Sequence, residues 1–381
     1  MGVIFYILFI FVTFVVTILT IITIFNFLTA PKLKKLTSKY TGELDQKLVS
    51  ILIPARNEEG NIAKALLSAI NQTYKNVEII VLDDQSTDNT ANIVERIIQK
   101  YPNKRIKLYS GTDLPDGWNG KSWACYNLAK YANGDFLLFI DADVVLNKCA
   151  VSSSMDIMQK YNLDLLTVVP SQVTKTLGEK ILVSTFMEWL LAVFLPIRIA
   201  NALYIPSLSA ACGQYMFFRK NAYHAIDGHA CVGKNIAGEL EITRTLKRNH
   251  YKVHLYLTDN LVFCRMYRNF KTAFHGFANN FYAGAKMKAF TFYLFVTTVF
   301  LAYTIPLILV IKDTKFYIPI ITIFIQTIFL SLMFKRSLIF NLIFYPVKMT
   351  LFLILAIKSH RRVVTNKIIW KDRQILREAI S

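Results

Sequence analysis

Long apolar segments lie near both ends of the chain, and a region of mixed polar and apolar composition lies between them. Residues 3–29 carry no charged side chain, and about 20 apolar residues suffice for a transmembrane helix. The segment lacks a basic N-terminal region and is too long for the apolar core of a signal peptide. It therefore predicts a retained membrane anchor over residues 1–30, followed by a basic linker over residues 31–47.

Three further apolar segments follow the central region. They cover residues 289–311, 316–334 and 338–357, and the third contains Pro346 and Lys348. Lysines and arginines follow the anchor and fill the tail, residues 358–381, and such flanks favour the cytoplasmic side. Three complete spans after the anchor would place this tail outside the cell. We therefore expect residues 338–357 not to cross, with the central domain and the tail both cytoplasmic.

Strand-like and helix-like segments alternate in the first half of the central region. Apolar runs of strand length occur at residues 48–54, 77–82, 105–110 and 136–141, and segments with helical spacing separate them. Strands that are apolar throughout and alternate with helices are typical of a mainly parallel sheet with helices on both faces. The pattern predicts an α/β fold over residues 48–288, with the break between its two halves near residue 150.

Polar and acidic residues follow the ends of these predicted strands. Arg56 and Glu58 follow the first strand, Asp83 and Asp84 the second, and Asp141 and Asp143 the fourth. In such sheets, ligands bind beyond the carboxyl ends of the strands, so these side chains should converge. No Gly-x-Gly-x-x-Gly motif follows any of the strands, which disfavours a dinucleotide-binding fold.

Asp141 and Asp143 are the most informative of these residues, since two like charges end an otherwise apolar run. Mg²⁺ typically takes one or two protein carboxylates and completes its shell with water and substrate phosphate oxygens. The alternative is that Asp141 caps a helix and Asp143 is solvated. The position at a strand end, beside a second acidic strand end, favours the metal site.

Four blocks of sequence carry a resemblance to a known family: "SILIPARNEEGNI", "VEIIVLDDQSTDNT", "GWNGKSWACYNLA" and "FLLFIDADVVL". In this order and spacing they resemble the family 2 glycosyltransferases, which have the GT-A fold, a Rossmann-like sheet of mainly parallel strands. The resemblance implies an inverting transfer from a nucleotide-diphosphate sugar of the UDP-glucose type, with Mg²⁺ or Mn²⁺ as cofactor.

The resemblance also implies roles for individual residues. Asp143 would bind the metal on the diphosphate, and Asp141 would face the ribose or share the metal. Lys121 would meet a phosphate or a sugar hydroxyl, with a solvated lysine at a helix start as the alternative, and Gln214 would border the pocket. The residues implied to hold the base and ribose are Pro54, Ala55, Arg56, Glu58, Asp83 and Asp84.

A catalytic base is expected in the second half of the domain. The segment "GELEITRTLKRNH" resembles a family block that opens with Glu-Asp, but here Gly238 stands at the Glu position and Glu239 at the Asp position. Glu239 is the candidate base and Glu241 the fallback. A glutamate that merely stabilises a helix start is the structural alternative.

The acceptor is expected to be a lipid. The chain has no Gln-x-x-Arg-Trp motif, which processive members of the family carry, and its layout resembles the lipid-modifying branch that includes carotenoid-acid and hopanoid-associated transferases. We expect transfer of one sugar to a carotenoid acid, a polyprenyl or another membrane lipid. The alternatives are a processive polysaccharide synthase, a sugar nucleotidyltransferase and a non-catalytic membrane scaffold. Residues 184–208 are predicted to lie in the membrane interface beside the acceptor.

Charge and cysteine content agree with this assignment. The net charge is +19, from 44 basic and 25 acidic residues, and the excess lies beside the membrane segments, where anionic lipid is the natural partner. No nucleic-acid-binding module accompanies the charge, so we expect no nucleic-acid partner. The five cysteines are scattered and contain no C-x-x-C motif, which predicts free thiols in a reducing compartment.

Overall fold

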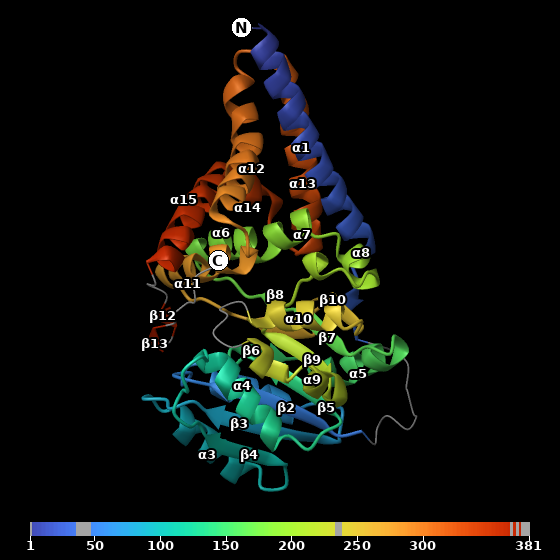
Figure 1. Ribbon diagram of the computed structural model, residues 1–381, viewed down its shortest axis with the longest axis vertical. Coiled ribbons are helices and arrows are strands. Elements are labelled where there is room, and N and C mark those ends of the chain that lie inside the picture. The colour runs from blue at the N-terminus through green and yellow to red at the C-terminus, as the bar shows by residue number, and fades with distance from the viewer. Residues whose placement is uncertain (1, 36–46, 233–237, 366–368, 371–372, 375–381) are drawn as a thin grey trace.

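The protein has an α/β domain with a layer of helices above it (Figure 1). The computed structural model describes residues 2–35, 47–232, 238–365, 369–370 and 373–374. Most of the expected basic linker and parts of the expected basic tail lie outside these residues. The prediction of an α/β domain joined to membrane-length helices is confirmed.

A mixed sheet forms the centre of the domain. Within the described residues it has eight strands, all parallel to their neighbours except β9, which runs antiparallel between β7 and β5. In spatial order these are β1 (Lys32–Leu33), β10 (Val253–Thr258), β7 (Leu165–Val169), β9 (Tyr215–Arg219), β5 (Phe136–Ile140), β2 (Val49–Ala55), β3 (Val77–Asp83) and β4 (Ile106–Ser110). From β2 the chain proceeds to β3 and β4, then returns to β5 on the other side of β2. The strand order therefore reverses between β2 and β5.

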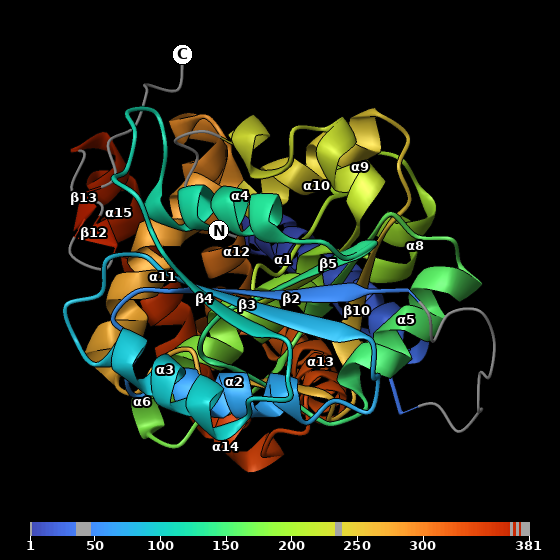
Figure 2. The same ribbon diagram turned by 90° about the horizontal axis from the view of Figure 1, so that it is seen from below.

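Helices cover both faces of this sheet (Figure 2). One face carries α2 (Ile62–Ile70), α3 (Thr90–Lys100) and α5 (Ala150–Lys160), and the other carries α4 (Gly120–Tyr131), α9 (Lys220–Ala225), the 3₁₀ segment η4 (Gly228–Val232) and α10 (Gly238–Arg248). Side chains alternate between two cores along each strand, because successive strand residues point to opposite faces. Ile51 and Ile53 of β2 enter the first core, while Leu52 enters the second.

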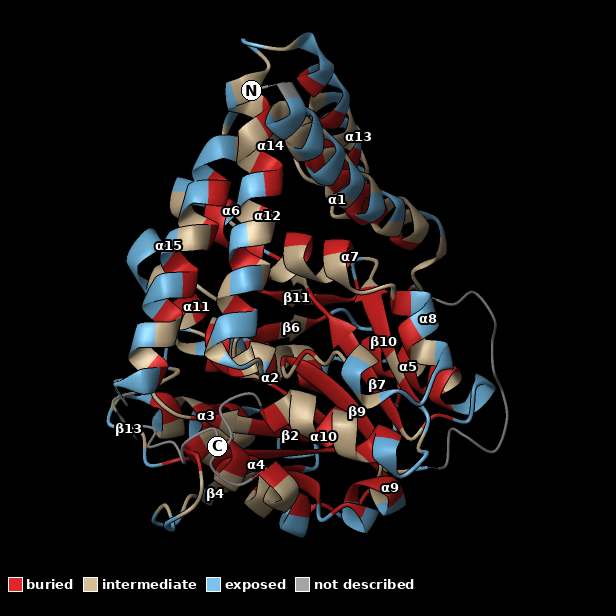
Figure 3. Ribbon diagram, turned by 45° about the horizontal axis from the view of Figure 1, so that its top comes forward, coloured by how far each residue is buried: buried red, intermediate tan, exposed pale blue. Residues whose placement is uncertain are grey.

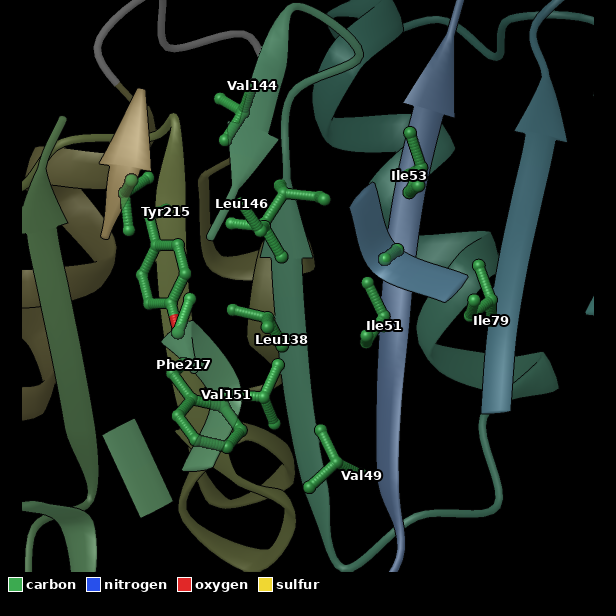
Figure 4. Close-up of a cluster of buried hydrophobic side chains, with 14 of the residues drawn as sticks. Val49, Ile51, Ile53, Ile79, Leu138, Val144, Leu146, Val151, Tyr215 and Phe217 are labelled. Carbon is green, nitrogen blue, oxygen red and sulfur yellow. The ribbon is translucent and has the colours of Figure 1, made fainter. Parts of the chain in front are cut away.

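The first core is closely filled at the middle of the sheet. Leu138, Tyr215 and Phe217 lie side by side across β5 and β9 (Figure 4), and each is fully buried. The Tyr215 hydroxyl lies 2.6 Å from the Ser154 hydroxyl of α5, so its polar atom is satisfied inside the core. This core supports the strands whose ends carry the candidate site.

A second, smaller sheet lies beyond the carboxyl end of β5. It consists of β6 (Val144–Leu146), β11 (Val262–Cys264) and β8 (Ser171–Gln172), in that order. Cys264 lies opposite Val144 on one side and Gln172 on the other. Because β6 follows Asp143 directly, this sheet fixes the turn that carries both aspartates.

Three helices among the described residues are long and apolar enough to cross a membrane: α1 (Gly2–Thr29), α12 (Ala289–Leu309) and α13 (Tyr317–Met333), with the short η5 (Thr314–Phe316) leading into α13. Exposed residues cover much of their surface (Figure 3), as expected for helices that face lipid. The predicted third C-terminal segment is split into α14 (Leu338–Ile343) and α15 (Tyr345–Val364), which packs against α11 (Phe270–Ala285). That residues 338–357 do not cross the membrane stays a prediction.

The segment predicted to be interfacial also forms no continuous long helix. It consists of the π-helix η2 (Ser184–Trp189), α7 (Leu190–Phe194), α8 (Ile197–Ala202) and η3 (Pro206–Leu208), and α6 (Leu177–Val183) directly precedes it. Asn26, near the end of α1, donates to the carbonyl oxygens of Ala192 and Leu195 at 2.9 and 2.7 Å and accepts from Ile197 N at 2.9 Å. These bonds hold the junction of α7 and α8 at the domain end of α1.

An ion pair joins the helical layer to the domain. Arg336, between α13 and α14, donates through Nε to both carboxylate oxygens of Glu188 at 3.0 and 3.1 Å, and through Nη2 to Gln172 O at 2.8 Å. Glu188 is buried within η2. Such a bidentate pair is geometrically specific. It also ties β8 and η2 to a segment 148 positions beyond Glu188 in the chain.

Replacement of Arg336 with alanine should destabilise the protein by about 3 kcal/mol, since Glu188 would keep a buried charge without its cation. We expect the lower end of the usual cost because Lys348 lies in the same cavity. The measurement is thermal unfolding of the purified chain in detergent. Replacement of both partners by Met and Leu is the control and should be nearly neutral. Equal stability of Arg336→Ala and wild type would contradict the assignment.

Candidate active site

The predicted site residues lie where the strand order reverses. Arg56 follows β2, Asp84 follows β3, and Asp141 follows β5, so all three lie at the carboxyl edge of the sheet. This is the position at which open α/β sheets bind ligands. The predicted convergence of these strand ends is borne out in their positions.

The loops after β2 and β3 form one surface. Arg56 donates through Nη1 to the carbonyl oxygens of Asp84 and Gln85 at 2.6 and 2.9 Å. Asn57 has a positive φ of 51°, and its Oδ1 accepts from Thr87 N at 2.8 Å. Glu58 N donates to Thr90 Oγ1 at 2.8 Å. Arg56 therefore shapes the loop through backbone contacts, and its direct contact with a nucleotide stays a prediction.

The acidic end of β3 is built into the same surface. Pro54 and Ala55 pair with the last residues of β3, and Asp84 N donates to Ala55 O at 2.7 Å. Asp83 accepts from Ser86 N through Oδ2, while its Oδ1 is buried and has no hydrogen-bond partner among the described residues. Asp83 is thus a preorganised hydrogen-bond acceptor at the edge where a ribose or base is expected.

Lys121 connects the two halves of the domain. Asn119 caps α4 by accepting from Ser122 N at 2.9 Å, which fixes the first helical turn. From this turn the Lys121 ammonium reaches Asp141 Oδ1 at 2.8 Å and Glu239 Oε1 at 3.0 Å. The structure thereby brings together three residues that are 20 and 98 positions apart in the chain.

The charges of this cluster determine one another's protonation. Burial would lower the pKa of Lys121, but Asp141 and Glu239 raise it well above its usual value. Burial would raise the pKa of Glu239, but Lys121 holds that pKa below the ordinary range. Burial, together with the charges of Glu239 and Glu58, raises the pKa of Asp141 despite its contact with Lys121. Glu239 is therefore ionised at neutral pH and is available as a proton acceptor.

Asp143 differs from Asp141 because no lysine or arginine in the described part of the chain forms an ion pair with it. Its Oδ1 is buried without a hydrogen-bond partner among the described residues. Burial and the nearby charges of Asp141 and Glu58 raise its pKa to about 7, and a hydrogen bond from the Cys264 thiol only partly offsets them. This is a carboxylate that an external positive charge would stabilise.

The residues present suit a divalent cation that a substrate helps to hold. Asp143 offers an unpartnered oxygen, and Asp141 and Glu58 add negative charge around it. In the described part of the chain, no group of three His, Cys, Asp or Glu side chains forms a complete metal site. One or two carboxylates completed by water and phosphate are the usual protein share of a magnesium site.

The side chain of Gln214 lies behind the two aspartates and is not exposed in the candidate site. Its side chain is buried, accepts from Gln172 Nε2 at 2.9 Å and lies 3.0 Å from the Cys264 sulfur through Nε2. Its carbonyl oxygen accepts from Asp141 N at 3.4 Å. Gln214 thus supports both aspartates from below, and its direct contact with a donor remains a prediction.

Sequence reasoning missed Cys264 and Gln172, which complete this support. The prediction of free cysteines agrees with the structure: Cys125, Cys212 and Cys264 are buried, and Cys149 and Cys231 are half-buried. Nothing in the sequence marks Cys264 apart from the other four, because its contact with Asp143 arises through pairing of β11 with β6.

Glu239 and Glu241 lie in different surroundings. Residues two apart on a helix do not face the same side. Glu241 forms ion pairs with Arg244, Arg248 and Lys286, which lower its pKa although burial opposes this. Glu239 instead shares Lys121 with Asp141. The geometry thus favours Glu239 as the candidate base. Glu241 instead belongs to a cluster of ion pairs that connects α10 to the end of α11.

The family of this domain follows from comparison with known proteins. Residues 50–227 match the family model described as glycosyl transferase family 2. The domain belongs to this family of glycosyltransferases, in agreement with the strand-end carboxylates. The fold agrees as well: a mannosyltransferase from Pyrobaculum calidifontis, solved in complex with GDP-Man and Mn²⁺, superposes with a TM-score of 0.58 at 14% identity, covering 93% of this chain and 99% of that one.

Two curated relatives carry a more specific name than the family. The chain is 31% identical over 266 residues to the 4,4'-diaponeurosporenoate glycosyltransferase of Staphylococcus haemolyticus (strain JCSC1435), covering 66% of each chain. It is 30% identical over 257 residues to the enzyme of the same name from Staphylococcus aureus (strain USA300), covering 64% of each. The matched region thus spans just under two thirds of the length of these relatives.

Replacement of Asp143 with asparagine should abolish stabilisation by Mn²⁺ while leaving the metal-free protein at least as stable as wild type. The substitution removes one of several mutually repelling carboxylates and also the oxygen best placed for the cation. Thermal unfolding with and without Mn²⁺ and a nucleotide-diphosphate measures both effects. The matched control is Asp135→Asn, which alters an exposed aspartate away from the site. A wild-type response to Mn²⁺ in Asp143→Asn would exclude this metal assignment.

Replacement of Gly213 with alanine should displace Glu239, because a Cβ at this position would overlap its carboxylate. We expect sugar transfer to an alcohol acceptor, which needs the base, to fall by about 100-fold, the usual effect of a misplaced catalytic group, with the fold retained. Gly284→Ala is the control, since a Cβ there meets no atom within 4 Å. Turnover is measured alongside thermal unfolding. Full activity in a folded Gly213→Ala protein would show that the position of Glu239 is not critical.

Proposed function

We propose that this protein is a membrane-bound inverting glycosyltransferase that moves one sugar from a nucleotide-diphosphate sugar to a lipid acceptor. The observation that carries the proposal is the Lys121 bridge between Asp141 at the end of β5 and Glu239 on α10. It joins the half of the domain that resembles nucleotide-sugar sites to the half that carries the candidate base. The two relatives named 4,4'-diaponeurosporenoate glycosyltransferase support a carotenoid-acid acceptor.

The donor would occupy the carboxyl edge between β2 and β5. The loops held by Arg56 and Asn57 provide the wall for the nucleoside, with Asp83 as an acceptor for its hydroxyl or amine protons. Asp143 and Asp141 would hold Mg²⁺ or Mn²⁺ against the diphosphate. When bound, such a cation supplies Lewis acidity that stabilises the departing diphosphate. The complex of the Pyrobaculum calidifontis enzyme with GDP-Man and Mn²⁺ supports this choice of cofactor.

Transfer would exchange one bond at the anomeric carbon for another. The acceptor oxygen attacks from the face opposite the diphosphate, and the bond to the diphosphate oxygen breaks with its electron pair. Where the acceptor is an alcohol, its proton passes to the ionised Glu239 carboxylate. Lys121 keeps Glu239 ionised before the reaction and offers its ammonium to the oxygens of the sugar or phosphate.

The membrane layer would supply the acceptor. The broken helices α6 to α8 lie between the domain and the three apolar helices (Figure 1). A lipid head group carried in this layer could approach the site without leaving the membrane surface. With the basic tail cytoplasmic, the positive-inside rule places the catalytic domain on the cytoplasmic side.

The test incubates membranes that contain the full chain with a panel of radiolabelled nucleotide sugars, followed by lipid extraction. We expect a singly glycosylated lipid from one donor, and no product when Asp143 is replaced with asparagine. Labelled polymer would indicate a processive synthase, and release of a new sugar nucleotide would indicate a nucleotidyltransferase. No product of any kind with any donor would support a scaffold.

Replacement of Glu239 with glutamine separates two acceptor classes. A carboxylic acid acceptor is already ionised at neutral pH, with an ordinary pKa of about 4 to 5, and needs no base. In this variant, transfer to an alcohol acceptor should be slower by about 100-fold or more, since general bases contribute this much. Transfer to a carboxylate acceptor should keep the wild-type rate within a few-fold. The rates are compared on matched alcohol and acid lipids, and unchanged turnover of the alcohol would rule out Glu239 as base.

A further inference from the structure

A second cavity lies apart from the candidate active site. It has about 580 Å³ of open space, counting its mouth, between the ends of α5, α8 and α10 and the start of β10. The candidate site lies at the carboxyl ends of the strands, whereas this cavity borders the amino end of a strand. Its lining residues are Tyr161, Asn201, Ala202, Leu203, Tyr204, Lys247, Tyr251, Lys252, Val253 and His254.

The lining is basic and contains no acidic side chain. Lys247 is 4% exposed and donates to the carbonyl oxygens of Ala200 and Leu208 at 2.6 and 2.9 Å. Within the described residues, the ammonium of neither Lys247 nor Lys252 forms an ion pair, although the backbone N of Lys252 donates to Asp164 Oδ2 at 2.8 Å. A lysine ammonium has three donors, so Lys247 keeps one beyond its two carbonyl contacts.

The buried charge of Lys247 is costly unless an anion accompanies it. Burial lowers the pKa of Lys247 to about 8, so it is still mainly protonated at neutral pH. Burial, followed by the charges of Lys247 and Lys252, lowers the pKa of His254 to about 4. Both lysines therefore lie close enough to influence the same neutral imidazole, and all three side chains line this cavity.

The wall between the cavity and the sheet is rigid. Asn201 donates to Leu255 O at 3.0 Å and accepts from Leu255 N at 2.8 Å. This pair of bonds fastens α8 to the open edge of β10, as a neighbouring strand would. The cavity is therefore formed before any ligand arrives, which limits the entropy cost of binding.

The rim of the cavity is apolar and faces outward. Leu203 and Tyr204 of the lining, and Ile199 and Ile205 nearby in the chain, are between 40 and 42% exposed. Residues 189–208 contain no Asp or Glu. Asn26 holds the start of α8 at the domain end of α1, where a membrane-spanning helix meets the interface. Exposed apolar side chains around a basic cavity at that level suit the surface of an anionic membrane.

We propose that this cavity binds the phosphate head group of an anionic phospholipid, with its rim inserted in the same leaflet. Lys247 and Lys252 hold the phosphate, and the tyrosines and His254 offer hydrogen bonds to its ester oxygens and polar head. The site is separate from sugar transfer. It fixes the domain against the membrane so that the edge between β2 and β5 keeps a constant height above the lipid.

The test titrates the purified full chain in non-ionic detergent with short-chain phosphatidylglycerol, short-chain phosphatidylcholine or inorganic phosphate. The readouts are the unfolding midpoint and the lipid retained in native mass spectrometry. We expect phosphatidylglycerol alone to stabilise the protein and to be retained. Equal effects of the two lipids, or an effect of inorganic phosphate without one of phosphatidylglycerol, would overturn the proposal.

Substitutions of the two lysines test whether phosphatidylglycerol binds in this cavity. Lys252→Gln should weaken phosphatidylglycerol binding about tenfold, the effect of one lost charge-assisted hydrogen bond of about 1.4 kcal/mol, and Lys247→Met should weaken it further. The matched control is Lys220→Met, since Lys220 also donates to a carbonyl oxygen, that of Ala132 at 3.0 Å, but lies outside the cavity. If Lys247→Met does not fold, Lys252→Gln decides the outcome. Wild-type binding by a folded Lys252→Gln protein would exclude the cavity.

Discussion

The crowding of carboxylates around one lysine is the constraint on which the arrangement of this protein depends. Asp141 and Glu239 share the Lys121 ammonium, while Glu58 and Asp143 add further negative charge at the same edge. Burial, followed by the charges of Asp141 and Glu58, raises the pKa of Asp143. The domain holds this unfavourable cluster in place because two filled cores lie behind it. Strained, charged sites of this kind are where proteins give up stability for function.

The supports of the cluster continue into the helical layer. Cys264 bonds to Asp143, Gln214 to Cys264, and Gln172 to Gln214. The carbonyl oxygen of Gln172 accepts from Arg336, which holds the buried Glu188 of the π-helix. The packing of the membrane helices is thus physically connected to the position of the candidate metal ligand. For the lipid acceptor proposed above, this link would connect the site to the phase from which the acceptor arrives.

Much of the fold could be predicted from local pattern. The strands at residues 49–55, 77–83, 106–110 and 136–140 agree with the predicted runs to within about one or two residues. For the three strands other than the partly exposed edge strand β4, the reason is that a strand buried on both faces leaves a continuous apolar signal. The site was predictable in outline for the same reason, since parallel strands deliver their ends to one edge. The choice between Glu239 and Glu241 was not, because both lie in the first turn of one helix and only the neighbouring lysines distinguish them.

The sequence by itself determined the alternation of strands and helices, the acidic strand ends and the apolar segments, since each depends on residues close together in the chain. Tertiary structure decided which charges meet. Lys121 reaches Glu239 across 118 positions, and Arg336 reaches Glu188 across 148. The roles of Gln214 and Cys264 likewise follow from strand pairing. Contacts of this kind leave no local periodic signal, because they depend on how the finished sheet and helices bring distant residues together.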